Sequence, residues 1–314
     1  MTAILGITFP IYAAIALGYL VVRQNWFSAA DMRTLGKYVM NIALPALLFN
    51  AVASRNVTEV FQPGYVLAFA AGGVSMIALA FAWFSFTAAD KPRRAIAVLG
   101  STCPNSGFIG FPVMLLIFPD VAGVILALNM LVENIILIPI CLVLMDMARD
   151  GAHKSVVHQI AGILMNVLRR PMVIGLLLGL AVSVLQIPMP DPATRLFQML
   201  AASASALSLI VIGGSLVGLP LRGNQFLATQ IAAAKLLVHP ALVALAVFLL
   251  PLIGMASPAP DMATAVILSA AMPMFGIYTV LAQEHGLEGL ASIAMLMTTS
   301  LAFFTLTALL LTLS

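Results

Sequence analysis

The chain has 314 residues, of which 62% are hydrophobic and only 8% are charged, and its mean hydropathy is +1.13. Ordinary soluble domains carry about 25% charged residues, so this composition excludes a water-soluble globular protein. It predicts an all-α polytopic integral membrane protein that lies in the lipid bilayer of the cell membrane (the inner or plasma membrane). The net charge of +3 is small, and nothing favours nucleic acid as a partner.

Ten segments of the chain are apolar over roughly the 20 residues that a membrane-spanning helix needs. In chain order they are 3–22, 34–53, 64–88, 94–118, 121–146, 171–187, 196–219, 226–250, 262–283 and 289–312. The longest polar stretch, 146–170, separates five spans from five. We therefore predict a first five-helix repeat at 1–150, a cytoplasmic linker at 151–170 and a second five-helix repeat at 171–314.

Lysine and arginine are distributed unevenly between the predicted loops. Most of them follow odd-numbered spans, whereas the opposite loops hold only Arg55 and Arg195. Because an excess of these residues marks the cytoplasmic side, we predict that both termini are non-cytoplasmic. Each half has an odd number of spans, so a repeat that relates the two halves must be inverted.

Two prolines interrupt apolar spans at matching places in the two halves. Pro104 lies inside the fourth span and Pro273 inside the ninth, which is the fourth span of the second half. A proline removes a backbone donor and clashes with the preceding turn, and lipid offers no replacement, so broken helices survive only where they line a protein cavity. Paired interruptions of this kind point to the binding site of a transporter.

The first interruption is unusually small and polar for the middle of a membrane. Asn105 can donate and accept hydrogen bonds at once, glycine allows close approach of the backbone, and the N-terminus of a following half-helix favours an anion. The alternative is a proline-kinked helix whose glycines serve only packing. We predict that the substrate-binding and crossover residues include Ser101, Pro104, Asn105, Gly107 and Pro273.

The second spans of the two halves add two candidates to that site. Asn41 precedes Pro45 inside the second span, and Ser205 lies in the seventh span. These spans could form walls of the same cavity. Packing of small residues at a helix interface is the competing interpretation, and we prefer it for the serine.

Glu133 and Lys235 are the charged residues near the middle of predicted spans. A charge there costs at least ~2.5 kcal/mol and usually marks an ion or proton pathway. Lys235 and His239 are four residues apart, so they share a helix face. We predict coupling or charge compensation by Lys235, His239 and Glu133. A structural cation that binds the carbonyls of an unwound helix is an equal alternative for Lys235, and a polar helix contact is preferred for Glu133.

The chain carries no residue set typical of catalysis or of metal binding. It lacks the Gly-x-Ser-x-Gly, His-Glu-x-x-His and P-loop motifs. Cys103 and Cys141 both lie in apolar runs and show neither a disulfide framework nor metal-ligand spacing. We expect no enzyme activity, no cofactor and no metal. Without a nucleotide site, transport must be passive or driven by a gradient.

Several segments of the chain resemble the auxin efflux carrier family, the bacterial relatives of the plant PIN proteins. The resemblance covers essentially the whole length, and its most specific motif is PNSGFIGFP at 104–112. The supporting segments are NIALPALLF at 41–49, GGSL at 213–216, Lys235 with Pro240, and Met272 with Pro273.

The resemblance implies a PIN/NhaA-like fold of ten transmembrane helices in two inverted five-helix repeats, with helices 4 and 9 broken and crossing at their prolines. It also implies a scaffold of helices 1, 2, 6 and 7, a mobile transport side made of the others, and elevator-type alternating access for organic anions. Bacterial members are often named malonate transporters, so a malonate-like dicarboxylate is the leading substrate class.

The sequence therefore predicts a secondary active transporter that moves a small organic anion, a carboxylate, with the proton among the candidate coupling ions. One alternative is a sodium-coupled organic-anion symporter, although carboxylates in mid-span are scarce. Another is a non-transporting membrane receptor, which the small extramembrane surface disfavours. The substrate, the direction of transport, the coupling ion and the oligomeric state, including a homodimer, stay open.

Overall fold

The computed structural model describes residues 2–55, 62–148, 162, 165–220 and 223–313. It is 82% helix, and the described residues form no strand, which confirms the all-α prediction. Within the described residues, six helices are long and apolar enough to cross a membrane: Ala29–Ala53, Pro63–Thr87, Ala122–Met147, Asp191–Ser215, Gln225–Ile253 and Glu288–Leu313. Four shorter apolar helices are Phe9–Arg23, Ser106–Ile117, Pro171–Leu185 and Pro260–Ala270. Most of the predicted linker at 151–170, including His153 and Lys154, lies outside the described residues.

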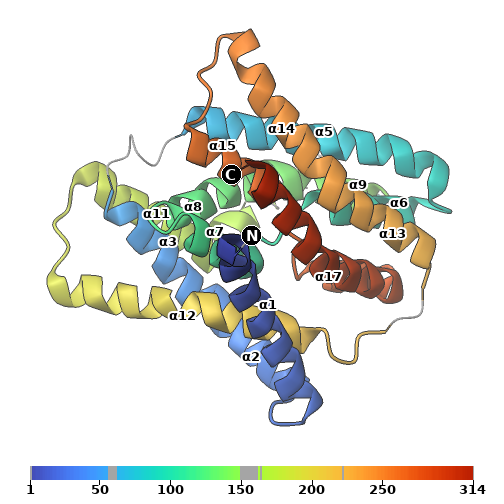
Figure 1. Cartoon of the computed structure of the whole chain (residues 1–314), viewed down its shortest axis with the longest axis horizontal. Helices are drawn as coiled ribbons and strands as arrows, with labels where there is room; N and C mark the ends of the chain where they lie inside the picture. The colour runs from blue at the N-terminus through green and yellow to red at the C-terminus, as the bar shows by residue number, and fades with distance from the viewer. Residues whose placement is uncertain (1, 56–61, 149–161, 163–164, 221–222, 314) are drawn as a thin grey trace. The chain divides into compact units, whose positions relative to one another are not determined.

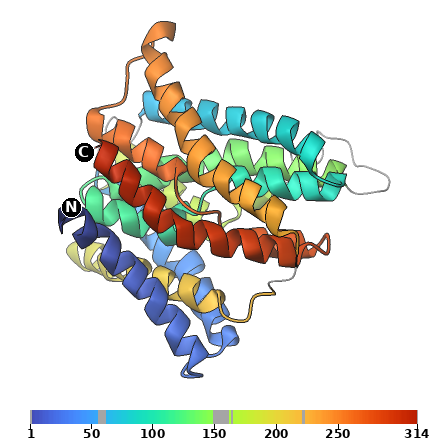
Figure 2. The ribbon, with the colours of Figure 1, turned by 45° about the vertical axis from the view of Figure 1, so that its right-hand side comes forward.

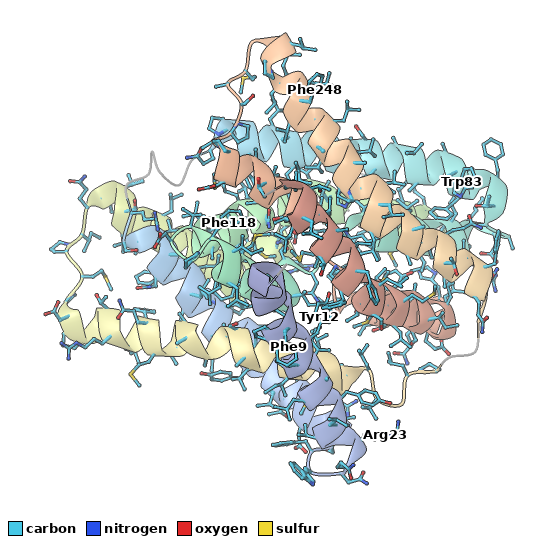
Figure 3. The ribbon with its side chains drawn as sticks, viewed as in Figure 1. Phe9, Tyr12, Arg23, Trp83, Phe118 and Phe248 are labelled. Atoms are coloured by element: carbon cyan, nitrogen blue, oxygen red, sulfur yellow. The ribbon has the colours of Figure 1, made fainter. Side chains whose placement is uncertain are left out.

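Large apolar side chains cover much of the surface of these helices. Phe86 is 89% exposed and Phe226 is 75% exposed. Phe248, on the helix α14 (His239–Leu249), is 73% exposed (Figure 3). Water would penalise so much exposed apolar area, whereas hydrocarbon chains do not. The surface therefore agrees with an integral membrane protein.

The helices group into two compact units, and each unit takes segments from both halves of the chain. The first unit contains Met1–Pro63, Ser106–Met130 and Asn166–Gly218, and the second contains Gly64–Asn105, Leu131–Met165 and Leu219–Ser314. The boundaries of the predicted repeats, 1–150 and 171–314, stay a prediction.

In the first unit, α1 packs on α12, and α11 and α12 pack on α3 (Figure 1). Glycines make the close approach of α11 to α3 feasible, because a Cβ on Gly175 or Gly179 would lie 2.5 Å or 2.7 Å from the carbonyl oxygen of Pro45 or Phe49. The helices of this unit are α1 (Thr2–Arg23), α2 (Ala29–Tyr38), η1 (Val39–Ala43), α3 (Leu44–Ala53), η2 (Ser106–Gly110), α7 (Phe111–Ile117), α8 (Ala122–Val132, ending at the border), α11 (Pro171–Leu185) and α12 (Asp191–Ser215).

In the second unit, α13 runs beside α17, α14 packs on α15, and α6 packs on α9 and α13 (Figure 2). The indole of Trp83 donates a hydrogen bond of 2.7 Å to Gln230, which joins the end of α5 to α13. Its helices are α5 (Pro63–Thr87, starting at the border), α6 (Lys91–Thr102), η3 (Glu133–Leu137), α9 (Ile138–Met147), α13 (Gln225–Ala233), η4 (Ala234–Val238), α14, η5 (Leu250–Ile253), α15 (Pro260–Ala270), α16 (Tyr278–Gln283) and α17 (Glu288–Leu313).

The segments η1, η2, η3 and η4 are π-helical turns, and each is followed by an α-helix whose second residue is a proline. In an α-helix the proline ring would clash with the carbonyl four residues earlier. A widened turn moves that carbonyl aside, which explains why the helices continue through these prolines. In three cases the residue before the proline donates its N–H to the carbonyl five residues earlier: Leu44 to Val39, Ile138 to Glu133, and His239 to Ala234.

The close packing of α11 on α3 predicts that replacement by alanine destabilises the protein at Gly179 but not at Gly6. We expect Gly179→Ala to destabilise the protein by about 1–3 kcal/mol, because the added methyl group overpacks against the backbone of Phe49. Gly6→Ala is the control, since no atom lies within 4 Å of its Cβ position, and it should be neutral or slightly stabilising. Thermal unfolding of the purified protein in detergent measures both; equal midpoints for the two variants would contradict the packing.

Candidate functional site at the crossing of two broken helices

The two helices that contain Pro104 and Pro273 are both broken, and both breaks lie in the second unit. The helix α6 ends at Thr102 and α15 ends at Ala270. Irregular backbone follows each end before helical structure resumes. The interruptions predicted from the two prolines are therefore present in the structure.

The two breaks pair with each other through their backbones. The N–H of Asn105 donates to the carbonyl of Pro273 at 2.7 Å, and the N–H of Phe275 donates to the carbonyl of Cys103 at 3.2 Å. Between these bonds Pro104 pairs with Met274 as an isolated antiparallel bridge. Each break thus supplies donors and acceptors to the other, which lipid could not do. We call this pairing the crossing.

Lys235 binds the end of one broken helix. Its Nζ donates a hydrogen bond of 2.6 Å to the carbonyl of Ala270, the last residue of α15. A carbonyl at that position has no helical partner, and a helix C-terminus carries partial negative charge. The Nζ atom also lies 3.0 Å from Nδ1 of His239. The fully buried ammonium group is therefore engaged by the protein itself.

A carboxylate and two thiols complete the buried cluster around Lys235. Glu133, in η3, is 3% exposed and interacts electrostatically with Lys235 and with Cys103. The thiols of Cys103 and Cys141 are buried and free, and they share a hydrogen bond, a contact that the sequence did not predict. Among the described residues, no group of three or more His, Cys, Asp or Glu side chains could hold a metal ion.

Among the described residues of this unit, two hydroxyl groups are buried without a hydrogen-bond partner. They belong to Ser101, in the last turn of α6, and Tyr278, the first residue of α16. The sequence predicts Ser101 as a site residue but does not indicate Tyr278, because a tyrosine in an apolar segment is typical of a packing residue. The related feature in the sequence is Gly100, which precedes Ser101. A Cβ at Gly100 would lie 2.8 Å from the Tyr278 ring, so a glycine is needed there.

The candidates Asn41, Gly107 and Ser205 belong to the first unit, and the other seven predicted site residues belong to the second. Asn41 is exposed in the π turn η1, and Gly107 is buried in η2, where a Cβ would lie 3.1 Å from Leu44 Cδ1. Ser205 is half-buried in α12, and its carbonyl accepts a hydrogen bond of 2.8 Å from the Ser208 hydroxyl. These contacts are internal to the unit.

The chain matches the family described as "Membrane transport protein" over residues 3–310. It belongs to that family. The match confirms the resemblance to auxin efflux carriers, and the family identifies a membrane transporter rather than an enzyme.

Relatives of this membrane transport protein carry transporter names. A protein of Rhizobium meliloti (strain 1021) named "Putative malonate transporter" is 30% identical over 99% of this chain and 96% of its own length. The "Uncharacterized transporter YfdV" of Escherichia coli (strain K12) is 26% identical over 222 residues, which cover 68% of each chain.

The electrostatic interaction of Glu133 with Lys235 predicts non-additive effects of their removal in this transporter. Lys235→Met leaves a carboxylate and a helix-end carbonyl without their cation, so we expect it to destabilise the protein by about 3–5 kcal/mol. In a protein that already carries Glu133→Gln, we expect Lys235→Met to cost less stability, because no carboxylate is then left without its cation. Thermal unfolding of both single variants and the double variant measures the coupling, which we expect to be about 0.5–3 kcal/mol. Strictly additive shifts would contradict this electrostatic interaction.

Proposed function

We propose that the protein is a secondary active transporter that moves a small organic anion across the membrane, with a malonate-like dicarboxylate as the first substrate to test. The crossing carries this proposal, because irregular backbone at membrane depth is typical of a substrate site in a transporter. The name of the Rhizobium meliloti relative supports malonate as the probe. The absence of a nucleotide-binding motif from the sequence favours a gradient as the driving force.

We further propose ten transmembrane helices in two inverted repeats, with both termini on the non-cytoplasmic side. Each of the six long helices and the four shorter apolar ones overlaps a different one of the ten predicted spans, which supports this count. The second unit, which contains both breaks, would carry the anion. The first unit, which contains α1, α3, α11 and α12, would be the scaffold of an elevator-type movement.

In this proposal the anion is held at the crossing by Ser101 and Asn105, next to the backbone of Pro104 and Pro273. Asn105 is 3% exposed, and its backbone N–H is used by the crossing. Its side chain can therefore be changed without removing that backbone bond. Lys235 would compensate the charge of the anion from behind the crossing, because its Nζ is already bound to Ala270.

Removal of the Asn105 side chain tests this site. We expect Asn105→Ala to lower kcat/KM for malonate uptake into proteoliposomes about 10- to 100-fold, which corresponds to the loss of a hydrogen bond to a charged group. Asn166→Ala is the matched control, since Asn166 is exposed in the first unit and should transport normally. Unchanged uptake by Asn105→Ala would show that the anion binds elsewhere.

We also propose that the proton is the coupling ion, because the cluster of Lys235, His239, Glu133 and Cys103 is the buried group of titratable side chains around the crossing. An imposed pH gradient should accelerate malonate flux several-fold. His239→Gln should abolish that acceleration and leave exchange down the malonate gradient. Flux that ignores the pH gradient, or that responds to a sodium gradient instead, would refute proton coupling.

A further inference from the structure

The hydroxyl groups of Ser101 and Tyr278 are buried and make no hydrogen bond within the protein. Both side chains are 0% exposed, and neither hydroxyl has a hydrogen-bond partner. Buried polar groups are nearly always paired, and an unpaired one is unfavourable. A phenylalanine would fill the space of Tyr278 without this cost. The hydroxyl group therefore requires another explanation than packing.

The two hydroxyl groups come from neighbouring turns of the second unit. The helix α16, which begins at Tyr278, packs on α6. Within α6, a Cβ on Gly100 would lie 2.8 Å from Cζ of Tyr278 and 2.9 Å from its hydroxyl oxygen. The phenol thus lies against the backbone of the residue before Ser101. Glycine is required there because the ring occupies the volume of a side chain.

The other broken helix provides an internal comparison. Ser101 is the penultimate residue of α6, and Ser269 is the penultimate residue of α15. The hydroxyl of Ser269 is paired with the hydroxyl of Tyr65 at 3.1 Å, and Tyr65 is also 0% exposed. One broken helix therefore ends with a serine–tyrosine pair that is satisfied internally. The other ends with a serine and a tyrosine whose hydroxyls are both unpaired.

We propose that the hydroxyls of Ser101 and Tyr278 bind a carboxylate group of the transported anion as hydrogen-bond donors, an inference that rests on the proposed function. A carboxylate only accepts hydrogen bonds and offers about four acceptor sites, and its bonds with hydroxyls are short and charge-assisted. Lys235 is engaged by Ala270 and His239. The carboxylate is therefore recognised by the neutral hydroxyl donors of Ser101 and Tyr278, and Tyr278 is a specificity-determining residue.

The comparison of Tyr278→Phe with Tyr65→Phe tests this inference, because both variants remove one hydroxyl from a fully buried ring. For Tyr278→Phe we expect an unchanged or higher unfolding midpoint without ligand, and an affinity for malonate about 10- to 100-fold lower. For Tyr65→Phe we expect a lower midpoint, because the hydrogen bond between Tyr65 and Ser269 is lost, and an affinity within about twofold of wild type. Ser101→Ala should behave like Tyr278→Phe.

Thermal unfolding and isothermal titration of the whole protein in detergent give both quantities. A Tyr278→Phe variant that binds malonate as tightly as wild type overturns this inference alone. A midpoint lowered as far as that of Tyr65→Phe also overturns it, since the hydroxyl would then have a structural partner. A wild-type protein that binds none of malonate, succinate or acetate overturns the proposed function, and this inference with it.

Discussion

Lipid cannot hydrogen-bond a peptide group, so every backbone group that a proline frees inside a membrane helix must find its partner within the protein. The crossing meets this constraint, because Asn105 and Phe275 donate to carbonyls of the opposite break. Neither broken helix could be satisfied in this way without the other. The rest of the second unit is arranged around this mutual dependence.

Lys235 satisfies a freed backbone carbonyl in the same way, at the end of a helix. Its ammonium group replaces the missing donor at Ala270, and Glu133 supplies an opposite charge inside the unit. The π turns that contain both residues precede prolines, and π turns occur often at functional sites. The backbone distortions and the buried charges are therefore located together, where a transporter needs polar groups at membrane depth.

The sequence predicted those features whose cause is local. Proline breaks a helix by its own covalent structure, so Pro104 and Pro273 could be identified without coordinates, and hydropathy gave the apolar helices. The bond from Lys235 to Ala270 joins residues on different helices, so neither its existence nor its partner follows from spacing.

Tyr278 was missed for the same reason: its significance depends on Gly100 and on an unpaired hydroxyl. Membership of Asn41 and Ser205 in the other unit also required the structure.

In the proposed function, the transported anion binds at the crossing. A cryo-electron microscopy structure of the protein with malonate tests it most directly. We predict density for the anion beside the breaks at Pro104 and Pro273, within hydrogen-bonding distance of the Asn105 side chain and the hydroxyls of Ser101 and Tyr278. Density for malonate elsewhere in the protein, with the residues of the crossing free of ligand, would contradict the account.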